Sequence, residues 1–214
     1  MHPRKFKILL VEDHAMVREG LKRIIAEAPD LEVAGEADDA SGAFKLLREN
    51  RWDVVVLDIS LPGQSGLEVL KVIRSEQPRL PVLVLSMHPE DQYAVRVIRA
   101  GASGYLTKES GPTKLIAAIR KVGYGGKCIS DTVAERLAGA LRGPGGGMPH
   151  EALSAREFEV LRLLASGKTQ AQIAEELHLS VKTVATYRAR ILEKMNMKTS
   201  AQLIAYGIKQ GLVA

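Results

Sequence analysis

The stretch that decides the fold reads Val54-Val55-Val56-Leu57-Asp58-Ile59-Ser60-Leu61-Pro62-Gly63. Its four leading apolar residues, three of them β-branched, predict a strand that is buried on both faces. The Asp58 carboxylate follows directly, at the carboxyl end of this strand and just before a Pro-Gly turn. Ligands of open parallel α/β sheets collect outside the carboxyl ends of the strands, so an acid here is well placed to react or to hold a metal.

Asp58 could instead be the N-cap of the next helix, which is a common role for aspartate. Ser65 and Glu68, however, have the spacing of a capping box and predict that this helix has its own cap. The chain therefore does not need Asp58 for capping.

Apolar segments on both sides of this stretch alternate between strand and helix patterns. The other strands are predicted at residues 8–11, 32–37, 82–85 and 104–107, and helices at residues 16–25, 44–47, 67–73, 89–100 and 112–122. Five strands alternating with five helices predict an α/β fold, a doubly wound five-stranded parallel sheet of the flavodoxin-like type.

The loop after the first strand carries Glu12 and Asp13. A phosphate-binding loop would have Gly, Ser or Thr there, since two carboxylates repel a phosphate unless a cation lies between them. With Asp58 they form an oxygen cluster that suits Mg²⁺, although three acids could also be solvated loop residues. The other strand ends favour a site, because Ser86 follows the fourth strand and Lys108 the fifth. A hydroxyl, an ammonium and a metal around one carboxylate are the parts that stabilise an acyl phosphate.

Residues 7 to 125 resemble the receiver domain of two-component response regulators. The resemblance rests on residues that occur in the family's order: Glu12, Asp13, Asp58 with Leu61-Pro62-Gly63, Ser86, Tyr105 and Lys108. It implies that Asp58 accepts a phosphoryl group from a cognate sensor histidine kinase. It also implies a switch made by Ser86, Tyr105 and Lys108, and a Mg²⁺ site made by Asp13, Asp58, the Ser60 backbone carbonyl and, partly through water, Glu12.

The receiver is expected to occupy residues 1–125, and residues 126–150 are expected to be a linker. This segment contains one short helix, predicted from Ile129 to Leu141, followed by a Gly/Pro tract at residues 142–149. Such a tract cannot pack a core and is typical of a flexible connection.

Helix starts are easy to recognise in the remainder, residues 151–214. Capping-box spacing occurs three times and a single cap once, at Ser154 with Glu157, Thr169 with Gln172, Thr199 with Gln202, and Ser180. Four helices are therefore predicted, starting near residues 155, 170, 181 and 200. His178-Leu179-Ser180, between the second and third, is a short turn of the helix-turn-helix kind. A protein-binding bundle could have the same spacing.

The third of these helices favours DNA over protein as the partner. Residues 181–198 have a net charge of +4, almost the whole excess of the chain, which is +5. Concentrated positive charge is a footprint of nucleic-acid binding, although a basic helix is also an ordinary solvated face. Helical spacing turns small residues outward among charged, mostly basic ones, which lets a helix enter the major groove: Lys182, Thr186, Ala189 and Glu193, with Ala185 and Arg190 beside them.

Residues 151 to 213 resemble the LuxR-type helix-turn-helix of NarL/FixJ regulators. The matching segments are Leu153-Ser154-Ala155-Arg156-Glu157, Gly167-Lys168-Thr169, Thr183-Val184 and Ile191-Leu192-Glu193-Lys194-Met195. The sequence departs from the family at Gln170, Tyr187 and Ser200, which leaves the preferred DNA sequence open. The resemblance implies that the chain binds double-stranded promoter DNA through Lys182, Thr183, Ala185, Thr186, Arg188, Ala189, Arg190 and Lys194.

We expect a phosphorylation-switched transcription regulator that forms homodimers when phosphorylated, through Leu203, Ile204 and Ile208 of the last helix. We expect no enzyme activity beyond Mg²⁺-dependent self-phosphorylation and slow autodephosphorylation. A phosphohydrolase is the competing hypothesis, but such enzymes usually have a second Asp two residues after the nucleophile, where this chain has Ser60.

Composition limits the alternatives further. The longest apolar runs are shorter than a membrane span and Cys128 is the single cysteine, so we expect a cytoplasmic protein without disulfides and without a membrane partner. The five histidines lack ligand spacing and are predicted to be ordinary surface or core residues: His2, His14, His88, His150 and His178.

Overall fold

The structure, a computed structural model, describes residues 5–62, 65–87, 90–140 and 148–212. The chain divides into two compact units, Met1–Leu137 and Ala138–Ala214, which are described separately below. The boundaries expected at residues 125 and 151 lie on either side of this division. Residues 142–147 of the Gly/Pro tract lie outside the described part of the chain.

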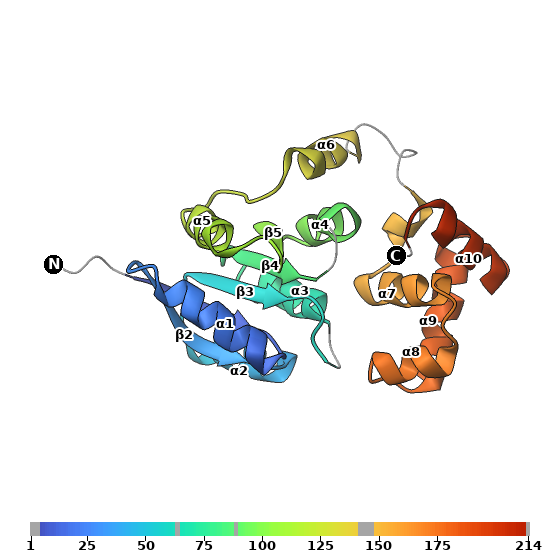
Figure 1. Cartoon of the computed structure of the whole chain (residues 1–214), viewed down its shortest axis with the longest axis horizontal. Coiled ribbons are helices and arrows are strands. Elements are labelled where there is room, and N and C mark those ends of the chain that lie inside the picture. The colour runs from blue at the N-terminus through green and yellow to red at the C-terminus, as the bar shows by residue number, and fades with distance from the viewer. Residues whose placement is uncertain (1–4, 63–64, 88–89, 141–147, 213–214) are drawn as a thin grey trace. The chain divides into compact units, whose positions relative to one another are not determined.

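The first unit is a five-stranded parallel sheet in the order β2-β1-β3-β4-β5 (Figure 1). Its strands are β1 (Phe6–Val11), β2 (Leu31–Ala37), β3 (Val54–Asp58), β4 (Val82–Ser86) and β5 (Gly104–Thr107). The helices between and after them are α1 (Ala15–Ala26), α2 (Ala40–Glu49), α3 (Gly66–Glu76), α4 (Glu90–Arg99) and α5 (Pro112–Gly123). The predicted doubly wound fold is confirmed.

Strand β3 lies at the centre of the sheet, and all five of its residues are buried. Successive side chains of a strand point to opposite faces, so each face of β3 belongs to a different core. Val54 and Val56 pack with Leu115 and Ile119 of α5 and with Ile25 of α1. Burial on both faces explains why the strand is a continuous apolar run. Asp58 is the last residue of this strand and therefore lies at the edge of the sheet where the strands end.

The segment after α5 pairs with the outer edge of β5. Cys128 and Gly104 form an isolated parallel bridge, in which the Tyr105 amide donates to the Cys128 carbonyl at 3.0 Å. A Cβ at Gly104 would lie 2.7 Å from the Cβ of Cys128, so this close approach depends on glycine. Helix α6 (Asp131–Ala140) follows, as predicted, but the sequence did not predict the pairing that precedes it.

The second unit is helical. After a short 3₁₀ helix, η1 (Pro149–Ala152), come α7 (Ala155–Ala165), α8 (Gln170–Glu176), α9 (Val181–Lys194) and α10 (Ser200–Lys209). All three predicted capping boxes of this unit are present, and Ser180 accepts a hydrogen bond from the Thr183 amide. The four predicted starts are confirmed because local capping chemistry decides them.

The turn between α8 and α9 is held by backbone bonds. His178 adopts a left-handed conformation with φ of 51°, and the Leu179 amide donates to the Ala174 carbonyl at 2.8 Å. These features end α8 and redirect the chain into α9, as a helix-turn-helix requires. In the described residues, no helix is long and apolar enough to cross a membrane.

Candidate functional site

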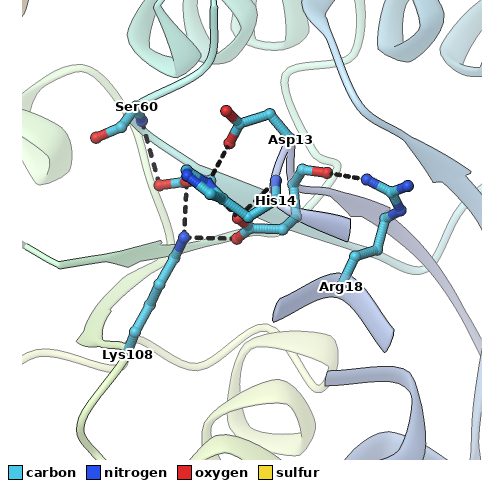
Figure 2. A network of polar contacts seen from close by, with 7 residues as sticks. Asp13, His14, Arg18, Ser60 and Lys108 are labelled. Atoms are coloured by element: carbon cyan, nitrogen blue, oxygen red, sulfur yellow. Dashed lines mark hydrogen bonds and ion pairs between the residues drawn. The ribbon is translucent and has the colours of Figure 1, made fainter. Parts of the chain in front are cut away.

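The acidic pocket, formed by Glu12, Asp13, Asp58 and Lys108, lies where β1, β3 and β5 end (Figure 2). Asp58 is 2% exposed, and its Oδ1 accepts a hydrogen bond from the Ser60 amide at 3.2 Å. The Lys108 ammonium lies 2.8 Å from Asp58 Oδ2 and 2.6 Å from Glu12 Oε2. The structure therefore brings together three residues that are far apart in the sequence, as the parallel arrangement of the strands predicts.

Burial and charge shape the chemistry of this pocket. Burial raises the pKa of the Glu12 carboxyl; the Asp58 charge adds to that rise, and the Lys108 ammonium opposes it. Burial alone would lower the pKa of Lys108, but Asp58 and Glu12 together hold that pKa above its usual value. With Asp13, the ionised pocket contains three carboxylates and one ammonium. This excess of negative charge would attract a cation.

The donor atoms of the pocket fit a small divalent cation. One ligand atom each from Glu12, Asp13, His14 and Asp58 can be chosen so that all lie within 4.8 Å of one another. Carboxylate oxygens are the ligands that Mg²⁺ prefers, and it is commonly held by one or two carboxylates together with water. The residues present are therefore compatible with the expected Mg²⁺ site.

Ser86 ends β4 and Tyr105 is the second residue of β5, and both are buried. Burial raises the pKa of the Tyr105 hydroxyl, and a hydrogen bond with the Ser86 side chain acts in the opposite direction. The Lys108 amide donates to the Ser86 carbonyl at 2.8 Å. Ser86, Tyr105 and Lys108 are thus linked in one network of hydrogen bonds, two of them between Ser86 and its neighbours.

The loop after Asp58 is held by its backbone and not by the predicted capping box. The Ser65 side chain makes no capping bond, and the Glu68 amide donates instead to the Ser65 carbonyl at 2.8 Å. The Gly66 amide donates to the Ile59 carbonyl at 3.0 Å. A Cβ at Gly66 would overlap the Asp58 carbonyl oxygen and lie 2.9 Å from Ile59 Cα. The capping-box prediction was wrong because α3 starts by folding back onto the end of β3.

Replacement of Gly66 by alanine is expected to destabilise the first unit by about 3 kcal/mol, because the added methyl meets backbone atoms that cannot move aside alone. Denaturant unfolding measures the change. Gly20→Ala is the matched control, because Gly20 lies within α1 and nothing lies within 4 Å of a Cβ added there. Its free energy of unfolding should rise by up to about 1 kcal/mol, since alanine favours a helix more than glycine does. Equal stability of the two variants would contradict the overlap at Gly66.

His14 and Arg18 also belong to the pocket, although the sequence interpretation assigned them no role. His14 Nδ1 lies 3.0 Å from Asp13 Oδ1 and 3.4 Å from Glu12 Oε1 (Figure 2). Arg18 donates to the Glu12 carbonyl at 2.6 Å. His14 is a surface residue, as predicted, but the sequence interpretation did not foresee that its ring lies beside these carboxylates; its position next to the Glu12-Asp13 pair was the signal that could have indicated this.

Helix α9 presents the expected basic face. Lys182, Thr186, Ala189 and Arg190 are exposed, whereas Val184 on the opposite side is buried. The Thr186 hydroxyl donates to the Lys182 carbonyl at 3.0 Å, so its oxygen lone pairs and its methyl group are what it offers to a partner.

Two other cations expected on DNA have partners within their own unit. Lys194 lies 2.7 Å from Glu157, a carboxylate that is only 3% exposed. Burial alone would raise the pKa of Glu157, but Lys194 and Ser154 hold it below its usual value. Arg188 donates to the Ser200 hydroxyl at 2.6 Å. These bonds tie α9 to α7 and to the start of α10, so neither cation is available to DNA without a competing contact.

The predicted dimer face of α10 needs a correction. Leu203 is 0% exposed and lies in the core of the unit, whereas Ile208 is 61% exposed and Ile204 is partly buried. Helix α10 packs against α7, and a Cβ at Gly207 would overlap the Cβ of Ala165. Leu203 therefore cannot contribute to a contact between copies, while Ile204 and Ile208 remain on the accessible side.

A doubly wound sheet whose strand ends gather three carboxylates, a hydroxyl and a lysine, in one chain with a helix-turn-helix, defines a phosphorylation-responsive regulator. Comparison with known proteins agrees in both units. Residues 8–120 match the response regulator receiver domain, and residues 151–206 match the bacterial regulatory proteins of the luxR family. The chain belongs to the NarL/FixJ family of response regulators, in which a receiver precedes a LuxR-type DNA-binding domain.

Similar proteins resemble this chain over nearly its full length. Response regulator GacA of Pseudomonas aeruginosa is 36% identical over 208 residues, which are 97% of each chain. Transcriptional regulatory protein LiaR of Bacillus subtilis is 38% identical over 208 residues, 97% of this chain and 99% of LiaR. A solved complex of response regulator RcsB with DNA has 26% identity and a TM-score of 0.59, and the match covers 95% of this chain and 98% of that one.

Proposed function

We propose that Asp58 accepts a phosphoryl group from a cognate sensor histidine kinase and that the phosphorylated chain binds promoter DNA. The observation that supports this most strongly is the pairing of the buried Asp58 carboxylate with the Lys108 ammonium at 2.8 Å. A buried carboxylate held between a cation and a backbone amide is fixed in orientation and is ready for attack on phosphorus.

In this proposal the residues around Asp58 divide the work of holding the acyl phosphate. Asp13, Asp58, the Ser60 carbonyl and, partly through water, Glu12 would hold Mg²⁺, which when bound would supply positive charge to neutralise the phosphoryl oxygens. Lys108 pairs with the phosphoryl group and stabilises its charge. Phosphorylation in this pocket acts as a regulatory switch and not as a step in the turnover of a substrate, in keeping with the regulatory family to which the chain belongs.

The Ser86 hydroxyl and the Tyr105 ring carry the response. Both residues are buried and the Ser86 side chain is hydrogen-bonded to the Tyr105 hydroxyl, so a new acceptor on Asp58 competes for the Ser86 hydroxyl and biases the position of Tyr105. Such a local contact shifts a two-state equilibrium when it favours one state by a few kcal/mol. Residues 1–125, together with the segment at Cys128 that pairs with β5, then act as the receiver, the rest of residues 126–150 as the linker, and residues 151–214 as the DNA-binding domain.

In its phosphorylated form the protein binds double-stranded DNA as a homodimer, and it does so in the cytoplasm. Helix α9 enters the major groove through Thr183, Ala185, Thr186 and Ala189, and the cations contact phosphates: Lys182, Arg188, Arg190 and Lys194. The exposed Ile208 and the neighbouring Ile204 of α10 supply the contact between copies. The DNA complex of the related RcsB supports DNA as the partner.

The test measures DNA binding and mass together. Fluorescence anisotropy with promoter fragments selected from genomic DNA, repeated with and without Mg²⁺ and acetyl phosphate, should show about tenfold or greater tightening on phosphorylation. Sedimentation should show a shift from monomer to dimer under the same conditions. Ile208→Glu should keep the phosphorylation and lose the dimer on DNA. Unchanged affinity and mass after complete phosphorylation would overturn the proposal.

A further inference from the structure

His14 touches the acidic pocket without being accounted for by the phosphoacceptor chemistry. It occupies the position just before α1, where its side chain makes no capping bond. Its amide donates to Glu12 Oε1 at 3.3 Å, and its ring lies against both carboxylates of the acidic pair (Figure 2). The side chain is 66% exposed, so solvent and ions reach it freely.

The distances around His14 match those of neighbouring ligands on one ion. In an octahedral site with bonds near 2.1 Å, adjacent ligand atoms stand about 3.0 Å apart and opposite ones about 4.2 Å apart. His14 Nδ1 is 3.0 Å from Asp13 Oδ1 and 3.4 Å from Glu12 Oε1. One atom from each of these residues and from Asp58 lies within 4.8 Å of the others. The imidazole nitrogen is therefore close enough to the acidic pair to share one ion with it, in place of the hydrogen bond that it makes with Asp13.

We propose that His14 Nδ1 is a direct ligand of the divalent cation and that the pocket consequently favours Mn²⁺ and Co²⁺ relative to an all-oxygen site. This inference rests on the cation site of the proposed function. Imidazole is a good ligand for first-row transition ions, whereas Mg²⁺ binds it poorly and prefers oxygen. On binding, any proton on Nδ1 leaves to solvent, and the hydrogen bond to Asp13 is replaced by a shared ion.

Mn²⁺ serves as the probe, because electron paramagnetic resonance counts the free ion and pulsed measurements detect a directly bound nitrogen. The full chain is titrated at pH 7.5, and Mg²⁺ affinity is obtained by competition. His14→Gln is expected to weaken Mn²⁺ about tenfold and Mg²⁺ less than twofold, and to remove the nitrogen coupling. His178→Asn is the control; His178 is an exposed histidine of the other unit, and asparagine tolerates its left-handed backbone.

The outcomes separate this inference from the function on which it rests. Mn²⁺ binding without nitrogen coupling, or an equal loss for both ions in His14→Gln, overturns the His14 ligand and leaves the phosphoacceptor intact. Failure of the wild-type chain to bind either ion overturns both the ligand and the proposed cation site. Nitrogen coupling that persists in His178→Asn and vanishes in His14→Gln assigns the ligand.

Discussion

Asp58→Asn is expected to abolish labelling of the chain by acetyl phosphate in the presence of Mg²⁺. The variant keeps the size of the side chain but replaces the nucleophilic carboxylate with an amide, which cannot form the acyl phosphate. Asp58 differs from the other two acids of the pocket because it ends β3 and its Oδ1 is also fixed by the Ser60 amide at 3.2 Å, whereas Asp13 lies nearer to solvent. Phosphate-affinity electrophoresis of intact protein, with mass spectrometry of its peptides, measures the loss.

The matched control is Asp38→Asn, which makes the same chemical change at an exposed position of the same unit. It should be labelled at the wild-type rate. Thermal unfolding should show that Asp58→Asn is folded, since removal of one charge from a pocket with excess negative charge relieves repulsion. Undiminished labelling of folded Asp58→Asn would disprove Asp58 as the sole acceptor.

Lys182→Ala is expected to weaken DNA binding between tenfold and a hundredfold at about 0.1 M salt, with little change in the preferred sequence. Each phosphate neutralised contributes about 0.9 to the slope of log affinity against log salt, so a dimer that loses two contacts should lose roughly two units of slope. The large effect is expected because Lys182 is exposed at the start of α9, while Lys194 and Arg188 already have partners in their own unit.

Anisotropy titrations at several salt concentrations measure both affinity and slope. Lys114→Ala removes the same charge from an exposed position of α5, in the other unit, and should leave the slope unchanged. Thr186→Ala should instead relax the preference at one base pair while keeping the salt slope, because its methyl and lone pairs face the groove. A changed sequence preference in Lys182→Ala with an unchanged slope would contradict this division between phosphate and base contacts.

The sequence by itself determined the elements and the meeting of the main site residues. The strand over Val54 to Asp58 is a continuous apolar run because both of its faces are buried, and that pattern is visible without coordinates. Parallel strands bring their carboxyl ends to one edge, so Glu12, Asp58 and Lys108 could be placed together from their positions alone. The helix starts of the second unit were predictable because capping depends on residues three apart in the chain.

Only the tertiary structure decided which side chains are buried or paired with partners on other elements. Lys194 and Glu157 are 37 residues apart, and no local pattern says that α7 carries a buried carboxylate to the end of α9. Leu203 and Ile208 look alike on a helical projection, but the packing of α10 on α7 buries one and exposes the other. At Ser65 the capping pattern was overruled by the backbone of β3, and His14 gained its place from the fold of the acidic loop. Contacts across elements depend on how the helices and strands pack, which periodicity and spacing do not specify.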